Sequence, residues 1–126
     1  MKLKQNEKII LKNSSLLNGM YFETYFHGIP INKKCNPANI YLTNQRIYVE
    51  TRALNICAVD LPLSKIHNVE IQRAVKYGLP IDFFNPKGLA ITYREGTEFR
   101  KLFLNLWGDN LDSWLRKINE ARGARS

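Results

Sequence analysis

Apolar and polar positions alternate along most of the chain, and this pattern predicts short β-strands up to residue 107. The alternation is clearest at residues 66–71 and 89–93. Further strands are expected at residues 20–26, 40–42, 47–51, 57–63 and 99–107. About seven short strands separated by turn residues are typical of an antiparallel sandwich or barrel.

The pattern changes to a helical period near the C-terminus. Apolar side chains there recur at intervals of three and four, at Leu111, Trp114, Leu115, Ile118 and Ala121. This spacing predicts one amphipathic helix, with Asp109 or Asn110 as its N-terminal cap. We expect the apolar stripe to cover an open end or corner of the β-structure, with Trp114 filling the centre.

Two stretches lack a clear period and are expected to be loops. Residues 28–37 contain two prolines and a pair of lysines, and residues 74–88 contain several Gly and Pro residues. Neither resembles a linker between domains. We therefore expect one domain spanning residues 1–126, with loose ends at about residues 1–6 and 123–126.

The sequence IYLTNQRIYVE, residues 40–50, interrupts an apolar run with four polar residues. The side chains of Thr43 and Asn44 can bond to nearby backbone, and Asn tolerates left-handed conformations, so this stretch is interpreted as a tight hairpin. Arg46 is expected to have a structural role. It either covers the carbonyl groups of the turn or pairs with a carboxylate.

Two short motifs resemble those of GRAM and bacterial pleckstrin-homology-like domains. The first is a Leu-Thr-Asn-x-Arg hairpin and the second a Pro-Leu-x-x-Ile-x-x-Val segment; their residues here are Leu42, Thr43, Asn44, Arg46, Pro62, Leu63, Ile66 and Val69. The resemblance spans roughly residues 8–122. It implies a strongly bent barrel of about seven antiparallel strands in two sheets, capped by a C-terminal helix. Domains of this fold bind phosphoinositides or peptides or act as scaffolds.

Charge and composition narrow the classes of partner. The 126 residues carry a formal net charge of +8, which favours anionic partners such as acidic proteins, anionic lipid or nucleic acid. The two cysteines, Cys35 and Cys57, are far apart and are expected to be free thiols. No metal-ligand spacing, nucleophile motif or phosphate-binding glycine loop is present, so we expect no metal, no cofactor and no enzymatic activity.

The candidate anion-binding residues are basic positions in loops or near strand ends: Lys33, Lys34, Arg52, Arg73 and Lys76. They could converge on one rim of the barrel, or they could simply be solvated. In lipid-binding pleckstrin-homology domains the basic cluster begins on the first strand, whereas residues 20–26 contain no Lys or Arg. A generic contact with an anionic membrane surface is therefore favoured over specific recognition of an inositol phosphate.

The candidate protein-interface residues are Ile81, Phe83 and Phe84, which form an exposed patch unless their loop folds back over the core. The main hypothesis is a protein-interaction or scaffold module, with self-association as an option because bacterial members of the resembled family form oligomers. Peripheral binding to anionic membrane lipid and weak nucleic-acid binding are the alternatives. The N-terminus lacks the apolar run of a signal peptide, so we expect a cytoplasmic protein, with contact at the inner membrane face as an option.

Overall fold

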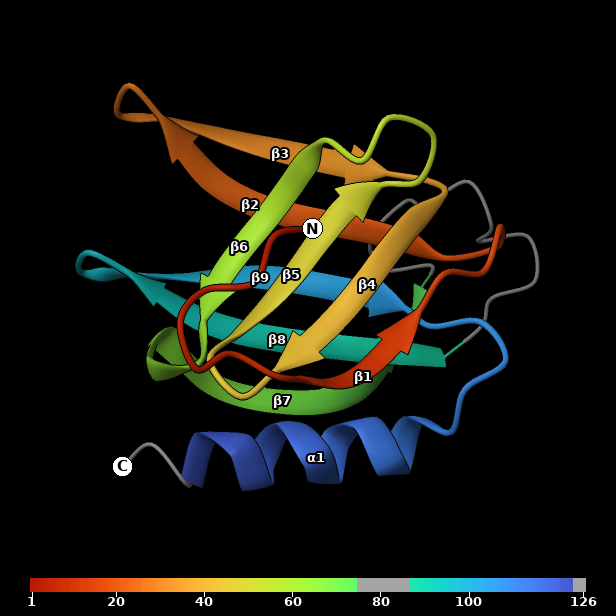
Figure 1. Cartoon of the computed structure of the whole chain (residues 1–126). Helices are drawn as coiled ribbons and strands as arrows, with labels where there is room; N and C mark the ends of the chain where they lie inside the picture. Colours follow the sequence, from red (N-terminus) through yellow and green to blue (C-terminus); the bar gives the residue numbers. More distant parts are fainter. Residues whose placement is uncertain (75–86, 124–126) are drawn as a thin grey trace.

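The computed structural model describes residues 1–74 and 87–123, which form two antiparallel sheets and a C-terminal helix (Figure 1). The strands are β1 (Ile9–Asn13), β2 (Gly19–Phe26), β3 (Ile29–Cys35), β4 (Ala38–Thr43), β5 (Arg46–Thr51), β6 (Cys57–Pro62), β7 (Ile66–Arg73), β8 (Lys87–Glu95) and β9 (Glu98–Asn105). The helices are the 3-10 helix η1 (Leu63–Lys65) and α1 (Leu111–Gly123). The predicted mainly β class, with two antiparallel sheets and a C-terminal helix, is confirmed.

The first sheet contains four strands in the order β1-β4-β5-β6. Successive side chains of a strand point to opposite faces, so alternate residues form its inner surface. Ile40 pairs with Val49 across β4 and β5, and both are fully buried in the core. The predicted hairpin at residues 40–50 is confirmed as β4, the Thr43–Arg46 turn and β5.

The second sheet contains five strands in the order β3-β2-β9-β8-β7. Its inner face packs on that of the first sheet, and the fully buried side chains that it contributes include Leu89, Ile91, Leu102 and Leu104. The core therefore lies between two facing sheets whose apolar positions were visible as alternation in the sequence.

The expected count of seven strands is wrong, because the structure has nine strands in its described part. The additional strands are β1 and β3, and β3 lies within the expected loop 28–37. Both residues of the β2–β3 turn, His27 and Gly28, have positive φ, which matches the right-handed twist of a two-residue hairpin. Pro30 and the two lysines of β3 are poor strand formers, but an edge strand tolerates them.

The expected barrel is not closed in the described residues. No strand belongs to both sheets, so the two sheets face each other with open edges. Figure 1 shows the end of β3 approaching the start of β6 at one corner, while α1 runs below β1 and β7 at another. The corner between β3 and β6 is therefore a place where strands meet without pairing.

Helix α1 covers the lower side of the sheets through the buried residues Trp114, Ile118 and Ala121. Asn110 caps the helix, because its Oδ1 accepts a hydrogen bond from the Ser113 backbone N–H at 3.0 Å. The Trp114 indole N–H donates to Asp109 Oδ2 at 2.8 Å, so the buried ring keeps a polar partner. Among the described residues, no helix combines the length and the apolar character needed to cross a bilayer.

Replacing Trp114 by Ala should destabilise the protein by about 3–5 kcal/mol, because the side chain is 2% exposed and its removal leaves a large cavity. Chemical denaturation would measure the loss. The matched control is Trp107→Ala, since Trp107 is 40% exposed and should cost much less. Equal losses for the two variants would contradict this role of Trp114.

Candidate functional site

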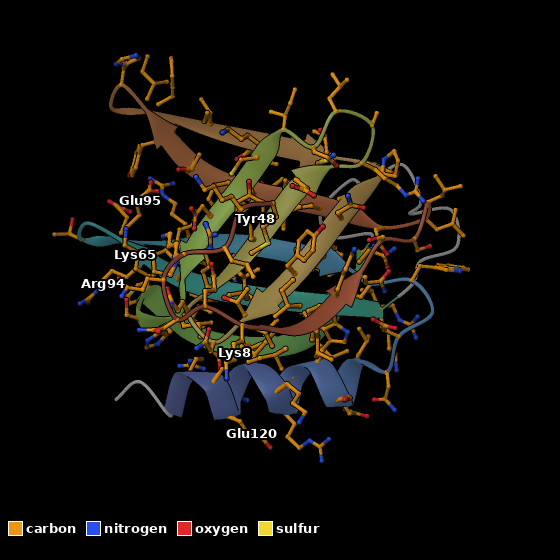
Figure 2. All side chains as sticks on the ribbon, viewed as in Figure 1. Lys8, Tyr48, Lys65, Arg94, Glu95 and Glu120 are labelled. Carbon is orange, nitrogen blue, oxygen red and sulfur yellow. The ribbon has the colours of Figure 1, made fainter. Side chains whose placement is uncertain are left out.

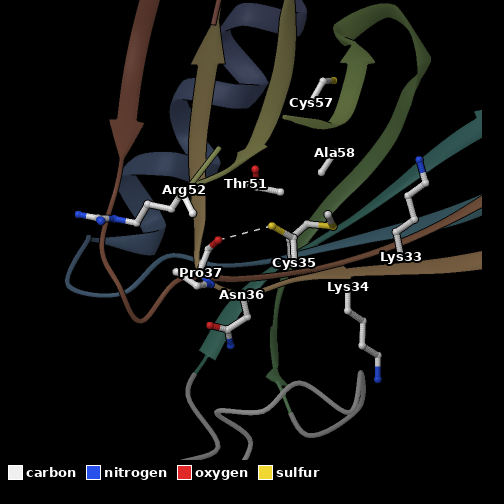
Figure 3. Close-up of a pocket in the computed structure, with 11 residues that line it drawn as sticks. Lys33, Lys34, Cys35, Asn36, Pro37, Thr51, Arg52, Cys57 and Ala58 are labelled. Carbon is white, nitrogen blue, oxygen red and sulfur yellow. Dashed lines mark hydrogen bonds between the residues drawn. The ribbon is translucent and has the colours of Figure 1, made fainter. Parts of the chain in front are cut away.

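A cavity of about 540 Å³ opens at the corner between β3 and β6 (Figure 3). It is bordered by the end of β3, the β3–β4 connection, the β5–β6 loop (residues 52–56) and the start of β6. The lining includes Lys33, Lys34, Cys35, Thr51, Arg52 and Cys57. We call this space the corner cavity. Three of the candidate anion-binding residues, Lys33, Lys34 and Arg52, line this cavity.

The charged ends of these three residues do not converge. Lys33 and Lys34 are consecutive on a strand, so their side chains leave opposite faces, and Figure 3 shows their amino groups pointing apart. Arg52 extends away from the cavity, and its Nε donates to the Ser14 carbonyl at 2.8 Å. The rim therefore provides a dispersed positive surface, in contrast to a pocket closed around one phosphate.

The remaining candidates are not part of this corner. Arg73 ends β7, which lies at the opposite edge of the five-stranded sheet from β3. Lys76 lies outside the described residues, and so do the three candidate interface residues, Ile81, Phe83 and Phe84. Of the candidates that could converge on one rim, only Lys33, Lys34 and Arg52 are placed together in the described part of the chain, and their charged ends point apart.

Exposed apolar residues that no sequence pattern predicts lie beside the corner cavity. Leu54 is 74% exposed and Ile56 is 55% exposed in the β5–β6 loop. This loop is closed by the Thr51 N–H donating to the Ile56 carbonyl at 2.8 Å. Leu16, which is 65% exposed, lies in the β1–β2 loop (residues 14–18), and the bond from Arg52 to Ser14 joins the two loops.

The two thiols at the corner cavity are both free. Cys35 is buried, which raises the pKa of its thiol, and its Sγ lies 3.5 Å from the Pro37 carbonyl. Cys57 is exposed. Within residues 1–74 and 87–123, no group of three or more His, Cys, Asp or Glu side chains is placed to hold a metal ion.

A second polar site lies on the outer face of the four-stranded sheet, under the first eight residues. We call residues 1–8 the N-terminal segment. Residues 1–6 were expected to be loose, but the segment crosses this face and is hydrogen bonded to it (Figures 1 and 2). Figure 2 marks Tyr48 on this face and Lys8 near the edge that faces α1. The covered face is polar, with Glu50 accepting a hydrogen bond from the Tyr41 hydroxyl at 3.0 Å.

Arg46 lies at the centre of this site and is 4% exposed. Its Nε and Nη2 donate to the two carboxylate oxygens of Glu7 at 2.8 and 3.0 Å, and its Nη1 donates to Asp60 at 2.8 Å. The expected structural role of Arg46 is confirmed, and of its two expected forms the structure shows the pairing with a carboxylate. Its partner Glu7 was not identified from the sequence, because 39 positions separate the two residues.

The environment of Glu7 lowers the pKa of its carboxyl group. Burial alone would raise this pKa, but hydrogen bonds from Arg46, Thr43 and the Lys4 backbone N–H outweigh burial and bring it to about 2. The carboxylate therefore stays ionised at neutral pH. It is held by a bidentate guanidinium contact, which is the strongest common geometry for such a pair.

No protein-family model matches this sequence, and no curated protein matches it significantly. The fold and the two sites are therefore interpreted from their own geometry.

The low pKa of Glu7 predicts a specific pH dependence of stability. The folded-state pKa is about 2 against an ordinary value of 4.5, so the stabilisation is complete above pH 4.5 and is lost as the pH falls toward 2. The total corresponds to about 3 kcal/mol. Glu7→Gln should lower stability at pH 7, and its difference from wild type should shrink on acidification. Denaturation of both proteins between pH 7 and pH 2 tests this, and a difference independent of pH would contradict it.

Proposed function

We propose that this chain is a non-catalytic binding module of the pleckstrin-homology-like or GRAM-like kind, and that it attaches peripherally to an anionic membrane surface. The observation that carries the proposal is the grouping of basic and exposed apolar residues around the corner cavity. Lys33, Lys34 and Arg52 supply positive charge, while Leu54 and Ile56 supply apolar surface. The two-sheet architecture with a C-terminal helix supports the family assignment.

The geometry favours a surface over a single phosphate group. Divergent charged side chains contact several headgroups at once, and each basic residue near an anionic bilayer contributes about 1 kcal/mol. A leucine at the tip of a closed loop adds about 1.5–3 kcal/mol if it enters the acyl boundary. Neither the basic residues nor the leucine is sufficient for membrane attachment alone, and together they give reversible attachment to the bilayer.

Binding to a protein partner or to a second copy is the second candidate, and the edge position of β3 in its sheet favours it. In the part of the chain that the structure describes, this seven-residue strand pairs with β2 alone and lies at the edge of its sheet, the position at which β-augmentation adds a strand. Lys33 and Lys34 on that edge oppose pairing with a basic strand, including another β3. Sedimentation equilibrium across a wide concentration range tests self-association, and a monomer throughout would remove it.

Cosedimentation with lipid vesicles tests the membrane proposal. The protein should pellet with vesicles of phosphatidylcholine and phosphatidylglycerol at low salt, less at moderate salt, and little with phosphatidylcholine alone. Lys33→Gln with Lys34→Gln should weaken partitioning about 30-fold, because about 2 kcal/mol is removed. Leu54→Ser should weaken it about tenfold or more, since the leucine tip no longer enters the bilayer.

The matched control is Lys65→Gln with Arg94→Gln, which removes the same charge from exposed positions at the other end of the sheets (Figure 2). This variant should partition nearly as wild type does. Equal weakening by both double variants would mean that only net charge matters and would overturn the assigned face. Absence of pelleting on anionic vesicles at low salt would remove the membrane function.

A further inference from the structure

All four residues of the Thr43–Arg46 turn bind the N-terminal segment. The Thr43 hydroxyl donates to Glu7 at 2.6 Å, and Arg46 contacts the same carboxylate. Asn44 Nδ2 donates to the Asn6 carbonyl at 3.0 Å and its Oδ1 accepts from the Lys8 N–H at 2.8 Å. The turn of the Leu-Thr-Asn-x-Arg motif is therefore a continuous set of hydrogen-bonding groups directed at a peptide.

The turn contacts one side chain of this peptide and otherwise its backbone. Gln45 Nε2 donates to the Gln5 carbonyl at 2.8 Å and Arg46 Nη2 to the Lys2 carbonyl at 2.9 Å, so both contacts are independent of side-chain identity. From Lys2 to Lys8, every residue except Glu7 is exposed. Such a site tolerates many sequences but requires one carboxylate.

The backbone of the bound segment adds a second requirement at the position before the glutamate. Asn6 has a φ of 59°, in the left-handed region that Asn and Gly adopt readily and β-branched residues avoid. The Glu7 N–H donates to the Lys4 carbonyl at 3.1 Å, and the Lys4 N–H donates to Glu7 Oε1 at 2.8 Å. The segment therefore binds as a turn in which Asn or Gly precedes Glu.

Residues 2–8 of the N-terminal segment are held by polar contacts, which water can replace. Leu3 is 46% exposed and anchors the segment little, whereas the Met1 side chain is 3% exposed and its ammonium nitrogen lies 3.2 Å from Glu50 Oε2. When the segment leaves, Arg46 keeps Asp60 as a partner, because Nη1 is bonded to that carboxylate independently of Glu7. Local opening of residues 2–8 is therefore compatible with an intact sheet.

We propose that the Thr43–Arg46 turn is a peptide-binding site for a protein partner's segment in which Asn or Gly precedes Glu, and that the N-terminal segment occupies this site in cis. The ligand is defined by the chemistry that the turn recognises, which is one carboxylate together with the carbonyls and N–H of the residues around it. The N-terminal segment competes with the partner at a high effective concentration. The site is separate from the corner cavity and does not depend on membrane attachment.

The test uses the full chain carrying Glu7→Gln, which weakens the occupant in cis, and synthetic peptides added in trans. The first peptide is acetylated KLKQNEKII, the sequence of residues 2–10; the second has Gln in place of Glu, and the third has Val in place of Asn. Fluorescence anisotropy of labelled peptides measures affinity. The first peptide should bind at least tenfold more tightly than either of the others, because each lacks one required feature. It should also bind Glu7→Gln more tightly than wild type.

Amide hydrogen exchange shows whether the N-terminal segment has been released, so each binding result either supports or contradicts the proposal. The Glu7 and Lys8 N–H groups should exchange faster in Glu7→Gln than in wild type, and unchanged protection would overturn the proposal because Glu7 would then not hold the segment. Faster exchange without peptide binding, or equal binding of the Glu and Gln peptides, would also overturn it. If Glu7→Gln unfolds, the peptides are added in excess to wild type. Faster exchange of the Lys8 N–H with the Glu peptide alone then supports the proposal, and no difference contradicts it.

Discussion

The buried guanidinium of Arg46 is the group on which the arrangement of the N-terminal half depends. A buried charge is tolerated only when it is paired and hydrogen bonded, and Arg46 has a carboxylate on each of its two sides. Glu7 meets this requirement from the N-terminal segment and Asp60 meets it from β6. One side chain of β5 therefore fixes the position of the segment before β1 and aligns the neighbouring strand β6.

This requirement explains why the outer face of the four-stranded sheet is covered at all. An outer face normally meets water, yet Thr43 and Glu50 on this face are almost fully buried. The N-terminal segment excludes water from these side chains and provides hydrogen-bonding partners in place of water. The Thr43 hydroxyl, for example, donates to Glu7. The sheet thus has an apolar inner layer and a polar, hydrogen-bonded outer layer, and the outer layer is what gives the Thr43–Arg46 turn its specificity.

The sequence predicted features that arise from local patterns and missed those that arise from distant pairing. The hairpin around Thr43 and the cap at Asn110 were predictable because each depends on a few adjacent residues. A structural role for Arg46 was correctly expected, and pairing with a carboxylate was one of its two expected forms, since a basic residue at a turn between apolar strands has few alternatives. Glu7 was not predictable as its partner, because a charged N-terminus is indistinguishable in sequence from a solvated one.

At the corner cavity, too, some features were predictable from the sequence and others were not. Lys33, Lys34 and Arg52 were identified as basic loop residues, and the structure places them around one cavity. The two lysines diverge because they lie on a strand, whereas residues 28–37 were expected to form a loop. Recognition of the His27-Gly28 turn would have predicted this strand. The exposure of Leu54 gave no sequence signal, because an apolar residue between polar ones fits either a strand or a loop tip.

Strand β5 connects the two sites and determines how they are oriented. Arg46 stands at its start and Thr51 at its end, so the peptide-binding turn and the corner cavity are about 17 Å apart along one extended strand. Figure 1 places the β4–β5 turn at the side of the molecule near α1 and the β5–β6 loop at the other side. A bilayer that contacts Leu54 and the basic rim would therefore leave the Thr43–Arg46 turn facing away from the lipid. In that orientation a partner's segment can exchange with the N-terminal segment without leaving the aqueous phase, so both sites can be occupied at once.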